Sequence, residues 1–149
     1  MLSKILYSGY QCVDFSFESI KESDGGRFKT NLISSEFVFY EKTEDHKDEV
    51  SPFDISLNVE LKAYDDDSDS DDNLAFKINI KLDVIFVVMD PEFDSLSDEF
   101  IKENKWYFEN YIALSMKLCL ERLSKNTPLD GIELPWSRKA GQSLLTTKN

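Results

Sequence analysis

The residues whose types could support catalysis are few and scattered. The only histidine, His46, sits within the charged segment Glu44–Glu49, and no patterned nucleophile stands beside it. A serine or cysteine triad is therefore not predicted, because that chemistry needs a base within hydrogen-bonding reach of the nucleophile. A zinc-type site would run short of histidine and cysteine ligands. The sequence thus predicts a non-enzyme without catalytic residues, metal ligands or a cofactor.

The run Asp65–Asp72 has the composition of a cation site. Asp65, Asp67 and Asp69 have the alternating spacing of the first ligands in an EF-hand loop. However, serine stands at the sixth position, where that turn needs glycine, and Phe76 stands at the twelfth, where a bidentate glutamate belongs. We interpret the run as a solvated loop, and weak cation binding is left open.

The two cysteines, Cys12 and Cys119, both lie within apolar patterns and lack the C-x-x-C spacing of a redox or zinc site. A buried free cysteine behaves as a small apolar side chain. The pattern therefore predicts two reduced thiols, with a disulfide as the less favoured alternative.

Length and charge narrow the classes of partner. The chain has 149 residues, of which 41% are hydrophobic, and 29 acidic residues against 17 basic ones give a formal net charge of −12. This suits one domain with a substantial core. A strongly acidic chain is a poor match for a phosphate backbone, so we expect polypeptide rather than nucleic-acid partners.

Nothing at the N-terminus resembles a signal peptide with an apolar core and a small-residue cleavage site. The longest apolar run, Val84–Met89, is far shorter than the roughly 20 residues that span a bilayer. We therefore expect a cytoplasmic protein that does not insert into membranes.

Four segments alternate apolar and polar residues with the period of a β-strand. The third is the clearest, because every odd position is apolar, and the fourth repeats its pattern after a loop, which predicts a hairpin. On the first, Val13, Phe15 and Phe17 are expected to share one face. The predicted strands are Tyr10–Glu18, Lys29–Glu41, Phe53–Lys62 and Phe76–Val88.

A long helix is predicted at Asp98–Ser124, capped by Ser97 or Ser95. Its apolar residues fall on two sides. One side, which includes Phe108 and Leu118, can cover the sheet, and the other needs a second partner, most simply another subunit. The residues predicted for that interface are Trp106, Ala113, Leu114 and Leu120.

Aromatic side chains on the first two strands form the most distinctive candidate binding set. Apolar residues occupy both faces of the second strand and of the late fourth strand, which is more than one helix can cover. These aromatics are therefore either core residues or the partly exposed walls of a groove that takes extended peptide. The set consists of Phe15, Phe17, Phe37, Phe39 and Tyr40.

The order of these elements resembles the SecB-like chaperone family. The resemblance is carried by Phe53–Leu61, Ala75–Val88, Tyr107–Leu123 and Ile132–Trp136. It implies an α+β fold, in which a four-stranded antiparallel sheet is followed by a long C-terminal helix, within a single domain of residues 1–137. The family continues into a second helix, but Ser137–Asn149 is basic and broken by glycine, so that helix is short or missing and residues 138–149 are expected to form a flexible tail.

The resemblance implies that the chain holds unfolded or aggregation-prone polypeptides in apolar grooves without ATP. The clients would be export precursors or a dedicated antitoxin, because the family includes antitoxin chaperones and divergent phage or plasmid members. It adds Trp136 to the client-binding set, as the anchor of the crossover after the helix. It also implies a homodimer or homotetramer, with the long helices packed between dimers.

Three other interpretations stay open. An acidic inhibitor of the antirestriction or immunity type would occupy a basic partner surface, although the acidic residues cluster in two loops rather than at phosphate-like intervals. An enzyme with an unrecognised site and an assembly component of a phage or secretion machine are the other two.

Overall fold

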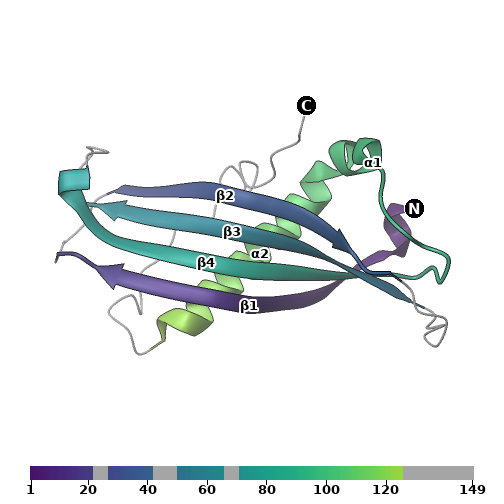
Figure 1. The fold of residues 1–149 in the computed structure, drawn as a ribbon, viewed down its shortest axis with the longest axis horizontal. Helices are drawn as coiled ribbons and strands as arrows, with labels where there is room; N and C mark the ends of the chain where they lie inside the picture. The colour runs from purple at the N-terminus through teal and green to yellow at the C-terminus, as the bar shows by residue number, and fades with distance from the viewer. Residues whose placement is uncertain (22–26, 42–49, 66–70, 126–149) are drawn as a thin grey trace.

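The computed structural model describes residues 1–21, 27–41, 50–65 and 71–125. Four antiparallel strands form one sheet, and the helices that follow lie across one of its sides (Figure 1). This confirms the predicted α+β class. The helical and strand elements are η1 (Leu2–Lys4), β1 (Ile5–Ser19), β2 (Arg27–Phe39), β3 (Ser51–Tyr64), η2 (Asp71–Asn73), β4 (Leu74–Val88), α1 (Asp98–Glu103) and α2 (Lys105–Ser124).

The strand order is β1-β4-β3-β2, so β3 and β4 occupy the centre and the first two strands form the edges. The predicted hairpin of β3 and β4 is confirmed, with Phe53 opposite Phe86 and Leu57 opposite Leu82. Their inward-facing side chains from Phe53 to Ala63 and from Ile78 to Val88 are 0% to 5% exposed. Strict alternation therefore produces one dry face, which we call the helix-facing side, and one wetted outer face.

The edge strands are less regular than the central ones. β1 shifts register between Tyr7 and Gly9 and again between Cys12 and Asp14, and β2 shifts between Leu32 and Ser34. A bulge adds one residue and reverses the alternation of the residues that follow it. Such irregularities also protect a sheet edge from unwanted pairing.

The second bulge overturns one prediction for β1. Val13 was expected to share a face with Phe15 and Phe17, but it falls in the bulge and is 56% exposed. Cys12 takes its place on the helix-facing side, opposite Leu82. A strict period of two cannot reveal this inversion, because the extra residue is visible only in the strand pairing.

The predicted single helix is in fact two helices. Asn104 interrupts it with φ −111° and ψ 21°, and both its backbone N–H and its Nδ2 donate to the carbonyl of Phe100. Asparagine side chains compete for backbone partners in this way, which disfavours a helix interior. Ser97 is the N-cap of α1, because its hydroxyl accepts the N–H of Phe100 at 3.1 Å.

Helix α2 crosses the sheet diagonally from β2 to β1 (Figure 1). Near its start, Phe108 packs edge-on against Phe37 of β2, with ring centroids 5.4 Å apart. The preceding residue, Tyr107, donates to the carbonyl of Ile5 at 2.7 Å. About one turn after Phe108, Tyr111 stacks on Tyr7 of β1 at 4.8 Å. The helix ends short of the far ends of the strands (Figure 1).

Candidate functional site

Aromatic side chains gather at two separate ends of the helix-facing side. In the pairing register, Leu82 and Leu57 lie between the two groups. One group lies under the start of α2, and we call it the proximal cluster: Phe37, Phe39, Phe53, Phe86 and Phe108. The other lies toward the opposite end of the strands, and we call it the distal cluster: Phe17, Phe28 and Phe76.

The centre of the proximal cluster is a closed aromatic core. Phe53, Phe86 and Phe108 are each 0% exposed. The rings of Phe53 and Phe86 stack at 5.3 Å, and Phe108 meets Phe86 edge-on at 5.5 Å. These are favourable geometries for aromatic pairs. Helix α2 therefore covers this end of the sheet directly, through Phe108.

The distal cluster is only half-buried. Phe76, on a central strand, is flanked by Phe17 of β1 at 5.8 Å and by Phe28 of β2 at 5.9 Å. All three are of intermediate exposure and pack against the core from its edge. These ring contacts join strand residues only, so the three side chains form an apolar strip that crosses the sheet from edge to edge.

The predicted groove residues are divided between these regions. Phe17 belongs to the distal cluster, and Phe15 lies two residues before it on the same face, half-buried and opposite Ile80. Phe37 and Phe39, also of intermediate exposure, belong to the proximal cluster, where both rings pack on the fully buried Phe53. Trp136 lies outside the described residues.

Tyr40 does not join the other groove residues. It is 51% exposed, and its hydroxyl donates to the carboxylate of Asp54 on the outer face. That hydrogen bond is the main cause that raises the pKa of Tyr40 to about 12, followed by partial burial. Tyr40 and the phenylalanines therefore occupy opposite faces, as the alternation along β2 requires.

The exposed face of α2 agrees only partly with the predicted interface. Trp106 and Leu114 are 52% and 42% exposed, and Ala113 is half-buried. Leu120, by contrast, is 2% exposed and belongs to the core, whereas Leu118, which was predicted to face the sheet, is 40% exposed. At about 100° per residue, Leu120 falls one turn above the buried Met116. The interface prediction was therefore wrong for Leu120.

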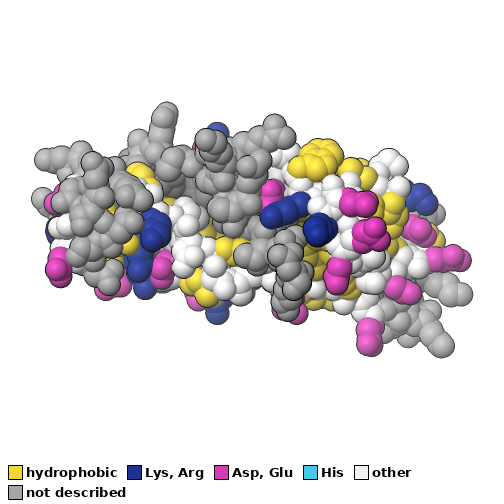
Figure 2. Space-filling view, turned by 90° about the horizontal axis from the view of Figure 1, so that it is seen from above, with side chains coloured by type: hydrophobic (Ala, Val, Ile, Leu, Met, Phe, Trp, Pro, Cys, Tyr) yellow, Lys and Arg dark blue, Asp and Glu magenta, His cyan; other side chains and the backbone are white. Residues whose placement is uncertain are grey.

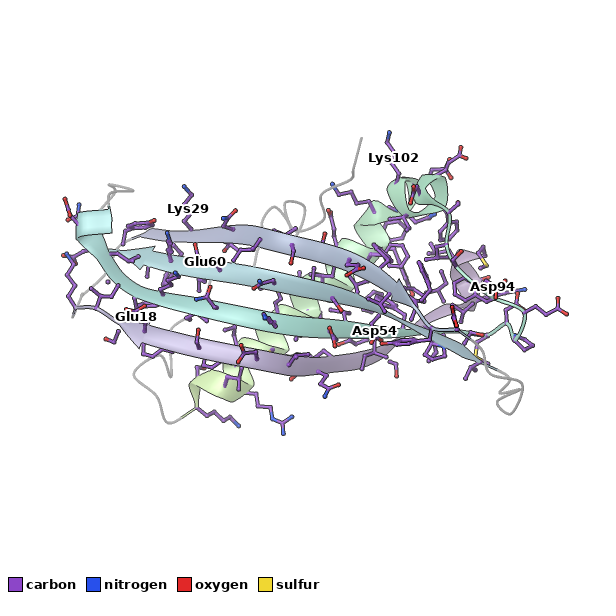
Figure 3. The ribbon with its side chains drawn as sticks, in the orientation of Figure 1. Glu18, Lys29, Asp54, Glu60, Asp94 and Lys102 are labelled. Atoms are coloured by element: carbon purple, nitrogen blue, oxygen red, sulfur yellow. The ribbon has the colours of Figure 1, made fainter. Side chains whose placement is uncertain are left out.

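The outer face of the sheet carries charged side chains, among them Glu60 and Asp54 of β3 (Figure 3). Glu60 lies between Lys77 and Lys62, at 3.2 Å and 3.5 Å, and the hydroxyl of Ser56 donates to Asp83 at 2.7 Å. Exposed pairs of this kind add little stability, but they neutralise the surface locally. Hydrophobic patches among charged side chains are visible at the end that carries α1 (Figure 2).

Across the described residues, no three histidine, cysteine, aspartate or glutamate side chains gather closely enough to hold a metal ion. His46 and the middle of the run Asp65–Asp72 lie outside those residues. Asp65 itself is engaged, with its carboxylate 3.5 Å from Lys21 and its N–H donating to the carbonyl of Asn73. Among the described helices, none is both long and apolar enough to cross a membrane.

Comparison with known proteins detects a similarity in fold but none in sequence. No family model and no curated protein matches the chain. Among solved structures, the Mycobacterium tuberculosis Rv1957 SecB-like chaperone, in complex with a ChAD peptide from the Rv1956 HigA1 antitoxin, aligns with a TM-score of 0.56. The alignment covers 89% of this chain and 90% of that one, at 9% identity. The chain has a SecB-like fold.

That similarity confirms the architecture that the order of elements predicted. At 9% identity it carries no residue roles, so the assignment of sites depends on this chain's own geometry. Sequence reasoning missed Phe28 as a site residue, because it lies one position before the predicted second strand. Its period-two relation to Thr30 and Leu32, which share its face, is the signal that could have included it.

Proposed function

We propose that this protein is an ATP-independent holding chaperone that binds unfolded or aggregation-prone polypeptide, and not an enzyme. The observation that carries the proposal is the half-buried distal cluster on a SecB-like sheet. Folded monomers rarely leave a contiguous aromatic strip partly exposed unless it binds something. Burying the remaining apolar area against a client stabilises the complex by about 25 cal/mol per Å².

The strip suits an extended apolar segment. It reaches both edge strands, and on β1 Phe15 extends it toward the middle of the sheet. Clients of this kind supply alternate apolar side chains that fit separate positions along such a surface. We assign Phe15 and Phe17 to client contact, and Phe37 and Phe39 to the core, since their rings already pack on buried ones.

The charge of the chain supports weakly selective holding of clients. A net charge of −12 keeps complexes soluble and attracts basic segments over long range. The SecB-like neighbour is in complex with an antitoxin peptide. We extend this to a dedicated antitoxin or an export precursor as client here, within the cytoplasm.

Self-association completes the proposal. Trp106, Ala113 and Leu114 share the side of α2 that points away from the sheet, and Leu118 borders them. Because a single apolar helix face is exposed, a second copy is its simplest cover, giving a homodimer or homotetramer. Trp106→Ser combined with Leu114→Ser should then lower the mass measured by sedimentation, whereas the buried Leu120 plays no part.

The test is light scattering from a dilute, aggregating unfolded protein without nucleotide. Wild-type protein should suppress aggregation at near-stoichiometric amounts, and Phe28→Ser should lose most of that effect. Ile33→Ser on the same strand is the matched control, because Ile33 is 52% exposed in the β2 bulge and lies outside the cluster. Urea unfolding of each variant separates lost binding from lost folding.

An acidic inhibitor that occupies a basic enzyme surface is the second candidate, and the net charge of −12 favours it. The outer face argues against it, because lysines alternate there with Glu60 and Asp83 instead of leaving a row of free carboxylates. Tight one-to-one binding to a single native basic protein, without suppression of aggregation, would favour this candidate.

A further inference from the structure

The contacts between α2 and β1 are spaced by one helical turn. Tyr107 donates to the carbonyl of Ile5, Tyr111 stacks on Tyr7, and the buried Ser115 hydroxyl lies 2.9 Å from the hydroxyl of the same Tyr7. Because Ser115 uses its own proton toward the carbonyl of residue 111, Tyr7 is the donor in this pair. Three positions four apart on α2 thus face β1 between Ile5 and Tyr7.

The next position in this series is Cys119. On β1, the bulge after Tyr7 makes Tyr10 and Cys12 the next helix-facing residues, opposite Val84 and Leu82. The progression along α2 therefore places Cys119 beside the part of β1 that contains Tyr10 and Cys12. Cys119 is 1% exposed and Cys12 is partly exposed, and both are free thiols.

The electrostatics agree with this placement. Burial raises the pKa of the Cys119 thiol to about 12, and the Cys12 thiol contributes next, through charge and a hydrogen bond, while Arg122 acts in the opposite direction. Such an influence requires that the two sulfur atoms lie close together. The Cys12 thiol also donates to the carbonyl of Asp14 at 3.6 Å.

We propose that Cys12 and Cys119 form a redox-responsive pair, which closes into an intramolecular disulfide between β1 and α2 on exposure to a low-molecular-weight disulfide. This goes beyond the proposed chaperone function and does not depend on it. The oxidant is chemically defined: a glutathione-type disulfide supplies both oxidising equivalents.

The reaction proceeds in two exchanges. The Cys12 thiolate attacks one sulfur of oxidised glutathione, so a Cys12–glutathione bond forms and one glutathione thiolate leaves. The Cys119 thiol then loses its proton and attacks the Cys12 sulfur, releasing the second glutathione. Two protein thiols are oxidised and one disulfide is reduced to two thiols. Partial exposure makes Cys12 the first to react, and the protonated, buried Cys119 resolves the adduct.

The experiment treats the folded, full-length chain with oxidised glutathione and follows intact mass, free thiols and Tm. Wild-type protein should become two hydrogens lighter, lose both thiols and gain about 10 °C in Tm, because the cross-link restricts the unfolded chain. Dithiothreitol should reverse all three changes. Cys119→Ala should stop at one glutathione adduct on Cys12, and Cys12→Ala should stay unmodified.

Three results would overturn the proposal. They are a persistent glutathione adduct on wild-type Cys12, a disulfide that joins two chains, and a disulfide that forms only when denaturant is added. The double variant Cys12→Ala, Cys119→Ala controls for folding, because its Tm should be insensitive to the oxidant. None of these readouts involves a client, so failure here leaves the chaperone proposal untouched.

Discussion

The two ends of the sheet carry the same kind of side chain and differ in what covers them. In the proximal cluster, Phe108 of α2 seals Phe53 and Phe86, and all three are 0% exposed. In the distal cluster, Phe76 contacts both Phe17 and Phe28, and all three stay half-buried. Phenylalanine is thus fully buried at the centre of one cluster and half-buried in the other.

The comparison shows that the diagonal path of α2 decides which aromatics are structural. A helix of 20 residues spans about 30 Å. Because α2 runs diagonally from β2 to β1, only part of this length extends along the strands. The far rows of a sheet built from strands of 13 to 15 residues consequently lie beyond the end of α2. Substitutions at the two ends of the sheet test this contrast between fully buried and half-buried side chains.

The largest loss of stability is expected when a ring is removed from the proximal cluster. Phe86→Ala should lower the free energy of unfolding by about 3–5 kcal/mol, because it removes a fully buried ring and leaves a cavity. Phe28→Ala, the distal counterpart, should cost only about 1–2 kcal/mol, since part of its surface is already solvated. Urea unfolding measures both. Equal losses would erase the distinction between the two clusters.

The same contrast applies to two leucines of α2. Leu120→Ala should lower the free energy of unfolding by about 2–4 kcal/mol, whereas Leu118→Ala should change it by no more than about 0.5 kcal/mol. The pair is matched in residue type and helix, and the two positions are only two residues apart. A larger loss for Leu118 would mean that the helix is rotated relative to the sheet.

The dependence of stability on alkaline pH tests whether the Cys119 thiol is buried. The pKa of Cys119 is raised from 9.0 to about 12, so folding favours the protonated form. Its contribution to stability is complete below pH 9 and is lost as the pH rises toward 12, because the unfolded chain ionises first. Wild-type protein should thus lose stability more steeply than Cys119→Ala between pH 9 and 10, below the range of pH 10 to 12 in which Tyr40 adds its own loss of stability. Parallel pH profiles would show that this thiol is solvated.

The smallest loss of stability is expected at the first β1 bulge. This bulge determines which of the following β1 residues face the helix. Gly9 has φ 145°, where L side chains are rarely found, although a Cβ there would meet nothing within 4 Å. Gly9→Ala should therefore cost about 1 kcal/mol, from backbone strain alone. Thermal unfolding measures it, with Ser8→Ala as the exposed neighbour for comparison. An unchanged Tm would show that the bulge relaxes.

The sequence alone predicts correctly which side chains of the central strands are buried, but it does not do so for the edge strands. The alternation from Phe53 to Leu61 predicts β3 and its hairpin correctly, because a regular strand buried on one face leaves only one register. Val13 was misplaced because a bulge is a property of the strand pair. Leu118 and Leu120 were each assigned to the wrong face of α2. Because apolar residues lie on both sides of the helix, its rotation relative to the sheet cannot be determined from the sequence.

The candidate site was recovered only in part. Phe15 and Phe17 could be selected as aromatics on an edge strand, but their exposure depends on where α2 ends, which no local pattern encodes. Phe28 was missed at the start of β2. The proximity of Cys12 and Cys119 needs both the β1 bulge and the helix register, two tertiary facts that a separation of more than 100 positions cannot reveal.

The most direct test of the account places the photo-crosslinking residue p-benzoyl-phenylalanine at position 28 in the distal cluster, or at position 39 in the proximal cluster. Each protein is irradiated with a chemically denatured client and no nucleotide. If the distal cluster binds clients, abundant crosslinks should form from position 28 and few from position 39, and an unlabelled apolar peptide should compete with them. Crosslinks confined to position 39, or absent from both positions, would contradict client binding at the distal cluster.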